Sequence, residues 1–412
     1  MAKKKETAPT TASSSPLLKA YAAIKGVLDE DPMVQIDTAS LRETLPHIST
    51  GSIVLNYLIG GRKNAYGVAP CPGYPRGKIA NIYGKAGAGK TTAALMAAAD
   101  VCNSGGTCLY LDWEHEVVTS YAKTLGVPVD DPSKFMLAQP DTMEDGLILM
   151  TKMAEAGVDL IIVDSVSAAK PREQEKPDVK DIGKQGPIGL QARKWSDFLP
   201  MYKKLIARTN TTVIAISQLR ANMSPMSMTD TDAQGGNAWK FYSTVRMNLV
   251  PVKKEKALVY NALTGKSEEQ VVATLVKATL DKCKVSDSNH HSQVLYLTQG
   301  RGYDNLRTVV EIAIAHKIIK KGGAWLEWQM PSGEVLRAQG MNQLKNLLKA
   351  KDNALNTLFE VTIPKILDSQ PDSDETIVEE ENDGESSTQD LLDIIEGKNT
   401  GAPKSDDDSE EE

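Results

Sequence analysis

Four apolar runs recur along the middle of the chain, and each ends in polar or charged residues. They cover residues 78–83, 107–115, 160–165 and 212–218. Short apolar runs bounded in this way are typical of strands buried on both faces of a sheet. Because helical stretches separate them, we expect an α/β fold with a mostly parallel twisted sheet flanked by helices.

The segments on either side of this region have other patterns. Residues 17–28 have apolar positions at helical spacing, and residues 33–36 form a short strand candidate. This opening part is too small for a core of its own, so it must pack on its own domain or on a neighbouring subunit. Residues 269–280 predict another strand. From residue 303 to 367 the pattern is helical with a hairpin strand at 325–328, which predicts a small α+β domain.

These patterns predict four parts along the chain. The expected parts are a disordered start with the N-terminal helix and strand over 1–45, the core domain over 46–303, a small C-terminal α+β domain over 304–367, and an acidic disordered tail over 368–412.

Charge adds a second contrast between the body and the tail. The net charge of −7 is the sum of two regions of opposite charge. Residues 368–412 contain 18 acidic residues and 2 lysines, a net charge of −16, which leaves a net charge of +9 for residues 1–367. A mildly basic body with an acidic tail suggests a nucleic-acid-binding protein whose tail competes with the phosphate backbone. A solvated tail that serves solubility explains the same charge distribution.

Composition excludes several other classes of protein. No apolar run approaches the roughly 18–20 residues that a membrane span needs, so no membrane partner is expected. The start of the chain lacks the apolar stretch of a signal peptide. The four cysteines show no CxxC spacing, so neither a zinc site nor a disulfide framework is indicated. A cytoplasmic protein fits these features.

The most informative chemistry is a glycine-rich loop that follows the first apolar run. It reads Gly84-Lys85-Ala86-Gly87-Ala88-Gly89-Lys90-Thr91 and continues with Thr92 into a run of good helix formers. Strand, glycine loop and helix are the setting of a phosphate-binding P-loop, where glycines let backbone N–H groups curl around phosphates. Lys90 would reach the β- and γ-phosphates of ATP, and Thr91 would hold Mg²⁺. The alternative is a glycine-rich turn with a chance lysine, against which the flanking elements argue.

Polar side chains at three other strand ends complete the candidate site. Ligands of open α/β sheets lie at the carboxyl ends of the strands. Glu114 is therefore placed to orient or deprotonate the attacking water, although a solvated loop acid would have the same pattern. Asp164 follows four apolar residues, as in a Walker B strand, and supports Mg²⁺ together with Thr91. Gln218 is placed to sense the γ-phosphate and to pass that signal into the loop that follows it.

Two loops on this side of the sheet are candidate binding segments. Residues 170–189 are rich in Lys, Pro and Gly, and residues 221–236 are rich in Met, Ser and Thr and end in Gly-Gly. Arg193, Lys194 and Arg220 flank them. Both loops follow strand ends, so ATP could order them, although ordinary surface loops have similar composition.

Taken together, these motifs resemble the RecA family of recombinases over about residues 17–365. The run from Gly235 to Tyr242 is the most specific match, because it is close to the signature that ends the family's second DNA-binding loop. The other matches are the opening motif of the core domain at Ile48–Ser52, the Walker A loop at Gly84–Thr91, the segment with the catalytic glutamate at Asp112–His115, the stretch Ser120–Lys123 whose Tyr121 would stack on adenine, and a turn of the C-terminal domain at Gly323–Trp325.

The resemblance implies a P-loop RecA-like core and an ATPase that forms filaments on single-stranded DNA. Such a protein would pair its strand with homologous double-stranded DNA and exchange strands in recombination and DNA repair, with single-strand-binding and loading proteins as further partners. Ile188 and Met223 would wedge between base triplets, which partly unstacks them. Contacts with the DNA backbone are implied for Arg193, Ser196, Arg220, Gly235, Gly236 and Asn237.

The resemblance also implies a head-to-tail helical filament with ATP between subunits. The strand at 33–36 would extend the neighbour's sheet, and two lysines would reach across to the neighbour's ATP. Lys277 matches the first of them, but Thr279 stands in the second place. Lys282 or Lys284 would substitute, as in phage UvsX-like relatives, which indicates a divergent and phage-encoded member in a bacterial or phage-infected cell. The catalytic set implied is Glu114, Lys90, Gln218 and Lys277.

Two other functions use the same motifs. One is a ring-forming DNA helicase motor on the same core, against which the Gly-Gly-Asn run argues. The other is a DNA-binding filament scaffold that binds ATP and hydrolyses little of it.

Overall fold

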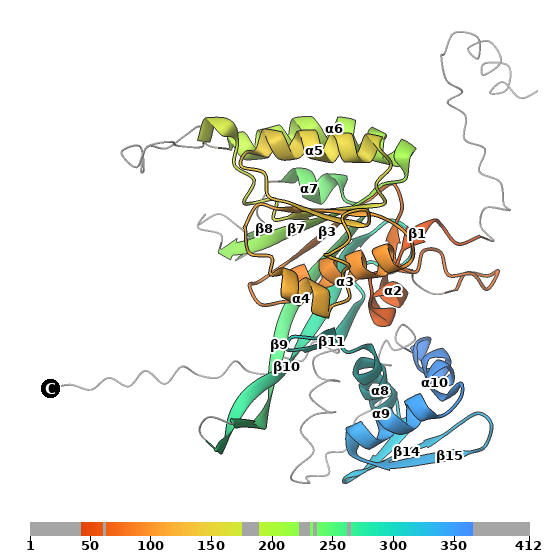
Figure 1. Cartoon of the computed structure of the whole chain (residues 1–412). Helices are drawn as coiled ribbons and strands as arrows, with labels where there is room; N and C mark the ends of the chain where they lie inside the picture. The colour runs from red at the N-terminus through yellow and green to blue at the C-terminus, as the bar shows by residue number, and fades with distance from the viewer. Residues whose placement is uncertain are drawn as a thin grey trace, which may run out of the picture. The chain divides into compact units, whose positions relative to one another are not determined.

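The computed structural model describes residues 43–60, 63–174, 189–221, 231–233, 237–261 and 265–365 (Figure 1). The elements expected over 17–28 and 33–36, most of both candidate DNA loops and the acidic tail lie outside these ranges. From Thr44 onward, the described residues belong to one compact unit.

A ten-stranded sheet forms the centre of this unit. Its strands are β3 (Ile79–Gly84), β4 (Cys108–Asp112), β5 (Phe135–Ala138), β6 (Leu160–Asp164), β7 (Thr212–Ala221), β8 (Thr231–Ala233), β9 (Val245–Asn261), β10 (Lys266–Cys283), β11 (Ser292–Thr298) and β12 (Gly302–Tyr303). Their order is β12-β11-β10-β9-β3-β7-β6-β4-β5, and β8 pairs with β7. All pairs from β9 to β5 are parallel, which confirms the parallel sheet expected from the four apolar runs.

An antiparallel extension continues the sheet beyond β9. The strands β9, β10, β11 and β12 pair antiparallel with one another, and β9 and β10 form a long hairpin. The expected strand over 269–280 lies within β10, so that prediction is confirmed. The length of the hairpin and its antiparallel pairing were not predicted.

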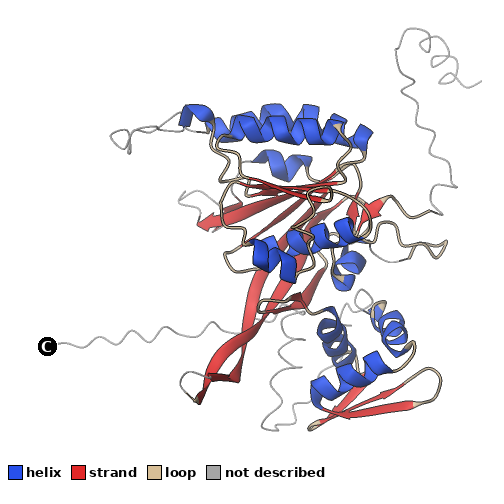
Figure 2. Cartoon of the chain, in the orientation of Figure 1, coloured by secondary structure: helices blue, strands red, loops and turns tan. Residues whose placement is uncertain are grey.

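Helices cover both faces of the sheet, because each parallel strand is apolar on both faces. In β6, Ile161 and Val163 point into one buried cluster, whereas Leu160 and Ile162 point into the other. Figures 1 and 2 show α5, α6 and α7 over one face and α3 with α4 over the other. The helices are α2 (Ile53–Gly60), α3 (Lys90–Asn103), α4 (Thr119–Thr124), α5 (Met143–Glu155), α6 (Leu190–Thr209) and α7 (Asn237–Tyr242).

Two smaller sheets complete the described structure. The strands β1 (His47–Ile48) and β2 (Tyr74–Pro75) pair antiparallel. After α8 (Asn305–Ala315), a three-stranded antiparallel sheet is followed by two helices, so the α+β character expected near the C-terminal end is confirmed. Its elements are β13 (Ile319–Gly322), β14 (Trp325–Gln329), β15 (Val335–Gln339), α9 (Gly340–Ala350) and α10 (Ala354–Thr362). Within the described ranges, no helix combines the length and apolar character that crossing a membrane requires.

Candidate nucleotide site and DNA-facing segments

The glycine loop between β3 and α3 has the backbone that its sequence predicts. Gly87 and Gly89 have φ values of 72° and 80°, in the left-handed region that favours glycine. A Cβ on Gly84 would lie 2.1 Å from the carbonyl oxygen of Leu249 on the neighbouring β9. The loop leads directly into the N-terminus of α3, where the helix offers free N–H groups and partial positive charge to an anion.

Lys90 lies over this loop at the first position of α3. Its Nζ donates hydrogen bonds to the carbonyl oxygens of Gly84 and Lys85 at 3.0 and 2.9 Å. Burial lowers the pKa of Lys90, whereas the carboxylates of Asp164 and Glu114 act in the opposite direction. The structure thus brings the predicted phosphate lysine close to both predicted strand-end carboxylates.

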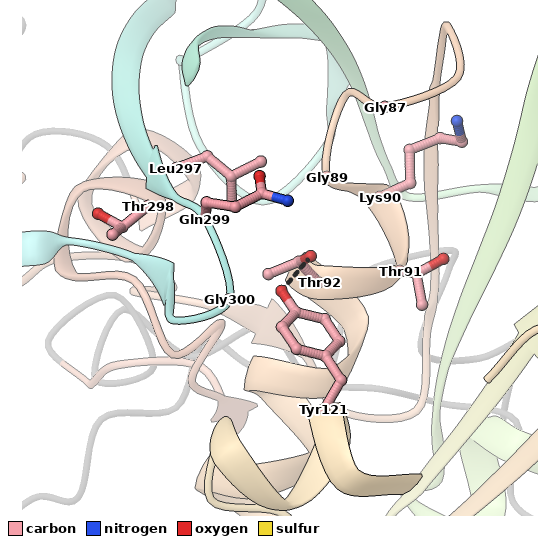
Figure 3. Close-up of a pocket in the computed structure, with 10 residues that line it drawn as sticks. All are labelled: Gly87, Gly89, Lys90, Thr91, Thr92, Tyr121, Leu297, Thr298, Gln299 and Gly300. Carbon is pink, nitrogen blue, oxygen red and sulfur yellow. Dashed lines mark hydrogen bonds between the residues drawn. The ribbon is translucent and has the colours of Figure 1, made fainter. Parts of the chain in front are cut away.

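A pocket of about 420 Å³ opens beside the loop (Figure 3). Its lining residues are Gly87, Gly89, Lys90, Thr91, Thr92, Tyr121, Leu297, Thr298, Gln299 and Gly300. The hydroxyls of Tyr121 and Thr92 lie 2.9 Å apart, which fixes the tyrosine ring of α4 beside the loop. The volume of the pocket falls in the usual range for small-molecule pockets, so the pocket is large enough for a nucleotide base and sugar. The wall at 297–300 was not predicted, and the glycine that ends it was its only signal in the sequence.

Two aspartates end neighbouring strands, and they have different partners. Asp112 of β4 and Asp164 of β6 are paired in register. The carboxylate of Asp112 accepts hydrogen bonds from the backbone N–H of Val117 at 3.2 Å and from Nε2 of Gln139 at 3.0 Å. Asp112 therefore holds the loop after β4, whereas Asp164 is available to the phosphate site.

Asp164 meets Thr91 at the position where a magnesium ion is expected. Thr91 Oγ1 and Tyr110 Oη both donate to Asp164 Oδ2, at 2.8 and 2.6 Å. Hydroxyl and carboxylate oxygens are the hard ligands that Mg²⁺ prefers, and Mg²⁺ is usually bound by few protein groups together with substrate phosphates. The pair of Thr91 and Asp164 fits Mg²⁺ bound together with the phosphates of ATP.

Burial governs the protonation of both groups behind the site. It raises the pKa of Asp164 to about 6, although the hydrogen bonds from Tyr110 and Thr91 oppose this shift. Burial and the neighbouring Asp164 also raise the pKa of Tyr110 well above its usual value. The phenol of Tyr110 therefore stays protonated at neutral pH and acts as the donor.

We expect Asp164→Asn to stabilise the protein in the absence of nucleotide. The pKa of this carboxyl rises from 3.8 to about 6 on folding. Between these two pH values the carboxyl is already ionised in the unfolded chain but still protonated in the folded protein. Raising the pH therefore lowers the free energy of unfolding of the parent, and this loss persists at higher pH. At pH values above the folded pKa, the lost free energy of unfolding amounts to about 3 kcal/mol. Urea unfolding of parent and variant across this pH range measures the difference, which should grow up to about pH 6 and then stay constant; a difference that does not change with pH would contradict the assignment.

Glu114 is held between two other strand ends. Its Oε1 accepts a hydrogen bond from Nε2 of Gln218 at 2.7 Å and another from Oγ of Ser165. The carboxylate therefore has a fixed orientation next to the phosphate loop, and a side chain near the end of β7 contacts it directly. Glu114 and Gln218 were each predicted to lie at the phosphates, but their contact with each other was not predicted.

The DNA-contact residues implied by the resemblance lie only partly within the described structure. Arg193 and Ser196 are exposed on α6, and Asn237 is exposed at the start of α7. Lys194 is different, because it forms ion pairs with Glu144 and Glu173 and so ties α6 to neighbouring elements. The residues outside the described set are Ile188, Met223, Gly235, Gly236 and the side chain of Arg220.

Three tryptophans connect the segments that follow the two candidate DNA loops with the nucleotide side. Trp113 precedes Glu114, Trp195 lies on α6, and Trp239 lies on α7. The ring of Trp195 packs edge-on against both others, with centroids 6.2 Å from Trp113 and 4.8 Å from Trp239. All three are buried, so a movement of one segment must be accommodated by the other two. Sequence patterns did not predict this cluster.

The candidate trans-acting lysines have different surroundings. Lys277 is half-buried in β10, and Lys284 is exposed after its end. Lys282 Nζ donates to the carbonyl oxygens of Lys240 and Phe241, at 2.8 and 2.9 Å, at the C-terminal end of α7. Lys282 therefore supports the helix that follows the second candidate loop.

Comparisons with known proteins show which proteins this chain is similar to. The model of the RecA N-terminal domain family matches residues 17–300. Protein RecA of Limosilactobacillus reuteri is 33% identical over 76% of this chain and 78% of its own, and Protein RecA of Borrelia hermsii is 30% identical over 83% and 88%. A crystal structure of the RadB recombinase aligns with 62% of this chain and 98% of its own, at 20% identity and a TM-score of 0.43. On the sequence matches, this chain belongs to the RecA family of recombinases.

Proposed function

We propose that this protein is a DNA-dependent ATPase that forms helical filaments on single-stranded DNA and catalyses homologous pairing and strand exchange in recombination and repair. The observation that carries the proposal is the hydrogen bond from Gln218 to Glu114. It connects the proposed general base to β7, the strand that leads into the second candidate DNA loop. Through such a contact, binding or hydrolysis of ATP can change the affinity of the protein for DNA.

In this proposal the phosphates of ATP lie along the loop from Gly84 to Thr91. Lys90 neutralises charge on the β- and γ-phosphates. Magnesium, held by Thr91 and Asp164, would neutralise the charge that develops between those phosphates. Glu114 orients a water molecule and accepts its proton, and the amide of Gln218 holds that carboxylate in place. Tyr121 stacks on the adenine in the pocket of Figure 3.

We propose that a second subunit completes the site. Lys277, together with Lys284, reaches the neighbour's ATP, because Lys282 is engaged with α7. Positive charge supplied in this way stabilises the transition state as an arginine finger does. A head-to-tail interface that does not close produces an open helical filament. The strand over 33–36 would add to β5 of the neighbour, since β5 is an end strand of the sheet and the other end strand, β12, has only two residues.

The remaining parts have roles around this filament. Residues 1–45 serve polymerisation, 46–303 form the ATPase core, 304–367 form the C-terminal domain, and 368–412 form an acidic tail that competes with DNA. Four free, buried cysteines among the described residues accord with a reducing cytoplasm, in a bacterium or in a phage-infected cell. Single-strand-binding and loading proteins would be its partners there.

Electron microscopy with single-stranded DNA, ATP and Mg²⁺ tests the assembly, and a strand-exchange assay tests the reaction. We expect open helical filaments and products only with a homologous duplex, with a heterologous duplex as the control. Closed rings that unwind duplex DNA would instead indicate a helicase motor. Filaments with neither hydrolysis nor exchange would indicate a scaffold.

A further inference from the structure

Tyr110 carries a phenol at the centre of a buried strand, between two leucines. It lies in β4, it is fully buried, and its ring packs against Phe135 of β5 with centroids 6.4 Å apart. Phenylalanine would fill the same space without a polar atom. A buried hydroxyl is costly unless it forms a hydrogen bond, so the partner of this phenol is informative.

That partner is a residue of the nucleotide site. Tyr110 Oη donates to Asp164 Oδ2 at 2.6 Å, and Thr91 Oγ1 donates to the same oxygen at 2.8 Å. The two donors come from different elements, the core strand β4 and the helix α3 that follows the phosphate loop. Asp164 has only 5% of its surface exposed, so water contributes little to holding its carboxylate.

The other ionisable groups near Asp164 cannot replace the phenol. Glu114 and Asp112 are carboxylates that repel it and raise its pKa. The Nζ of Lys90 attracts Asp164, but it donates to the carbonyls of Gly84 and Lys85. Tyr110 is thus the donor that reaches Asp164 from the apolar core.

We propose that Tyr110 is a positioning residue for the magnesium site. The phenol holds the Asp164 carboxylate against Thr91, so that the two side chains are already arranged as a pair before Mg²⁺ and ATP bind. The inference rests on the proposed ATPase function and adds to it a residue that touches neither nucleotide nor metal. Groups that orient metal ligands in this way typically contribute about 10- to 100-fold to metal affinity or activity.

The test is the dependence of nucleotide affinity on Mg²⁺ in Tyr110→Phe, which removes one oxygen and preserves the ring. A fluorescent ATP analogue is titrated against parent and variant, in excess Mg²⁺ and in EDTA. We expect Tyr110→Phe to bind the analogue about 10-fold more weakly than the parent in Mg²⁺ and as tightly as the parent in EDTA. An equal loss in both conditions would mean a structural role, and no loss in Mg²⁺ would also overturn the inference.

Tyr202→Phe is the matched control. Tyr202 is also a fully buried tyrosine, but its hydroxyl donates to the carbonyl oxygen of Met150 at 3.2 Å, in the core on the other face of the sheet. The same oxygen is removed, so a general effect of losing a buried phenol would appear in both variants. We expect no effect that depends on Mg²⁺ in Tyr202→Phe.

A double variant tests whether Tyr110 acts through Asp164. In the Asp164→Asn background, Tyr110→Phe should cause no further loss that depends on Mg²⁺, because the group that it positions has lost its charge. A full additional loss would contradict the inference. If the parent itself bound no nucleotide, the proposed function would fail instead, so the two failures can be told apart.

Discussion

Glu114→Gln should nearly abolish ATP hydrolysis and leave ATP binding intact. Glutamine has the shape of glutamate, and its carbonyl oxygen can still accept from Gln218 and Ser165, as Glu114 does. It cannot take a proton from water at neutral pH. Loss of a positioned general base costs about 100-fold or more in rate. Phosphate release in the presence of single-stranded DNA measures the rate, and the fluorescent analogue measures binding.

Two variants frame this result. Glu116→Gln makes the same change at an exposed glutamate two residues further on, and it should hydrolyse ATP like the parent. Lys90→Ala should weaken binding as well as hydrolysis and strand exchange, because Lys90 touches the loop itself. Hydrolysis by Glu114→Gln at the parental rate would remove Glu114 from the mechanism. With ATP bound and uncleaved, Glu114→Gln should also form filaments that persist on DNA.

The strand ends of this site were predictable because parallel strands all point the same way. A buried strand in an α/β sheet is recognisable from its apolar run, and its carboxyl end lies at the ligand-binding edge whatever the order of strands. Glu114, Asp164 and Gln218 could therefore be placed at one edge without knowledge of the register. The glycine loop was predictable for a related reason, since its backbone conformation restricts the residues that fit.

Contacts across the fold were not predictable from the same patterns. The hydroxyl of Tyr110 is hidden in an apolar run, and its meeting with Asp164 depends on which strands are neighbours and in which register. The pocket wall at 297–300 comes from the end of β11 and the turn after it, more than 170 residues after Tyr121 in the chain, and it reaches the site through the antiparallel extension. Lys282 was a candidate for the subunit interface, and only the structure shows that it holds α7.

Coupling between ATP and DNA is the property that depends most on such a contact. Gln218→Asn shortens the side chain by one methylene, about 1.5 Å, which takes its amide out of reach of Glu114. We expect DNA to stimulate hydrolysis less in this variant and ATP to strengthen DNA binding less. In binding, the effect of ATP on DNA affinity and the effect of DNA on nucleotide affinity should fall by the same free energy, because coupling between two binding sites is reciprocal. Coupling between two sites usually changes affinity by about 5- to 150-fold. In Gln218→Asn we expect most of the effect of ATP on DNA affinity to be lost.

The measurement is DNA affinity by fluorescence anisotropy, with and without a non-hydrolysable ATP analogue, together with nucleotide affinity with and without DNA. Gln329→Asn is the control, because it shortens an exposed glutamine of β14 in the same way. Nucleotide affinity without DNA should be unchanged in Gln329→Asn, since this residue lies on β14 and does not line the nucleotide pocket. If ATP still strengthened the DNA binding of Gln218→Asn as it does for the parent, the contact between Gln218 and Glu114 would not be the link between the two sites. The signal would then have to pass through another connection, and among the described residues the packing of Trp195 against Trp113 and Trp239 offers one.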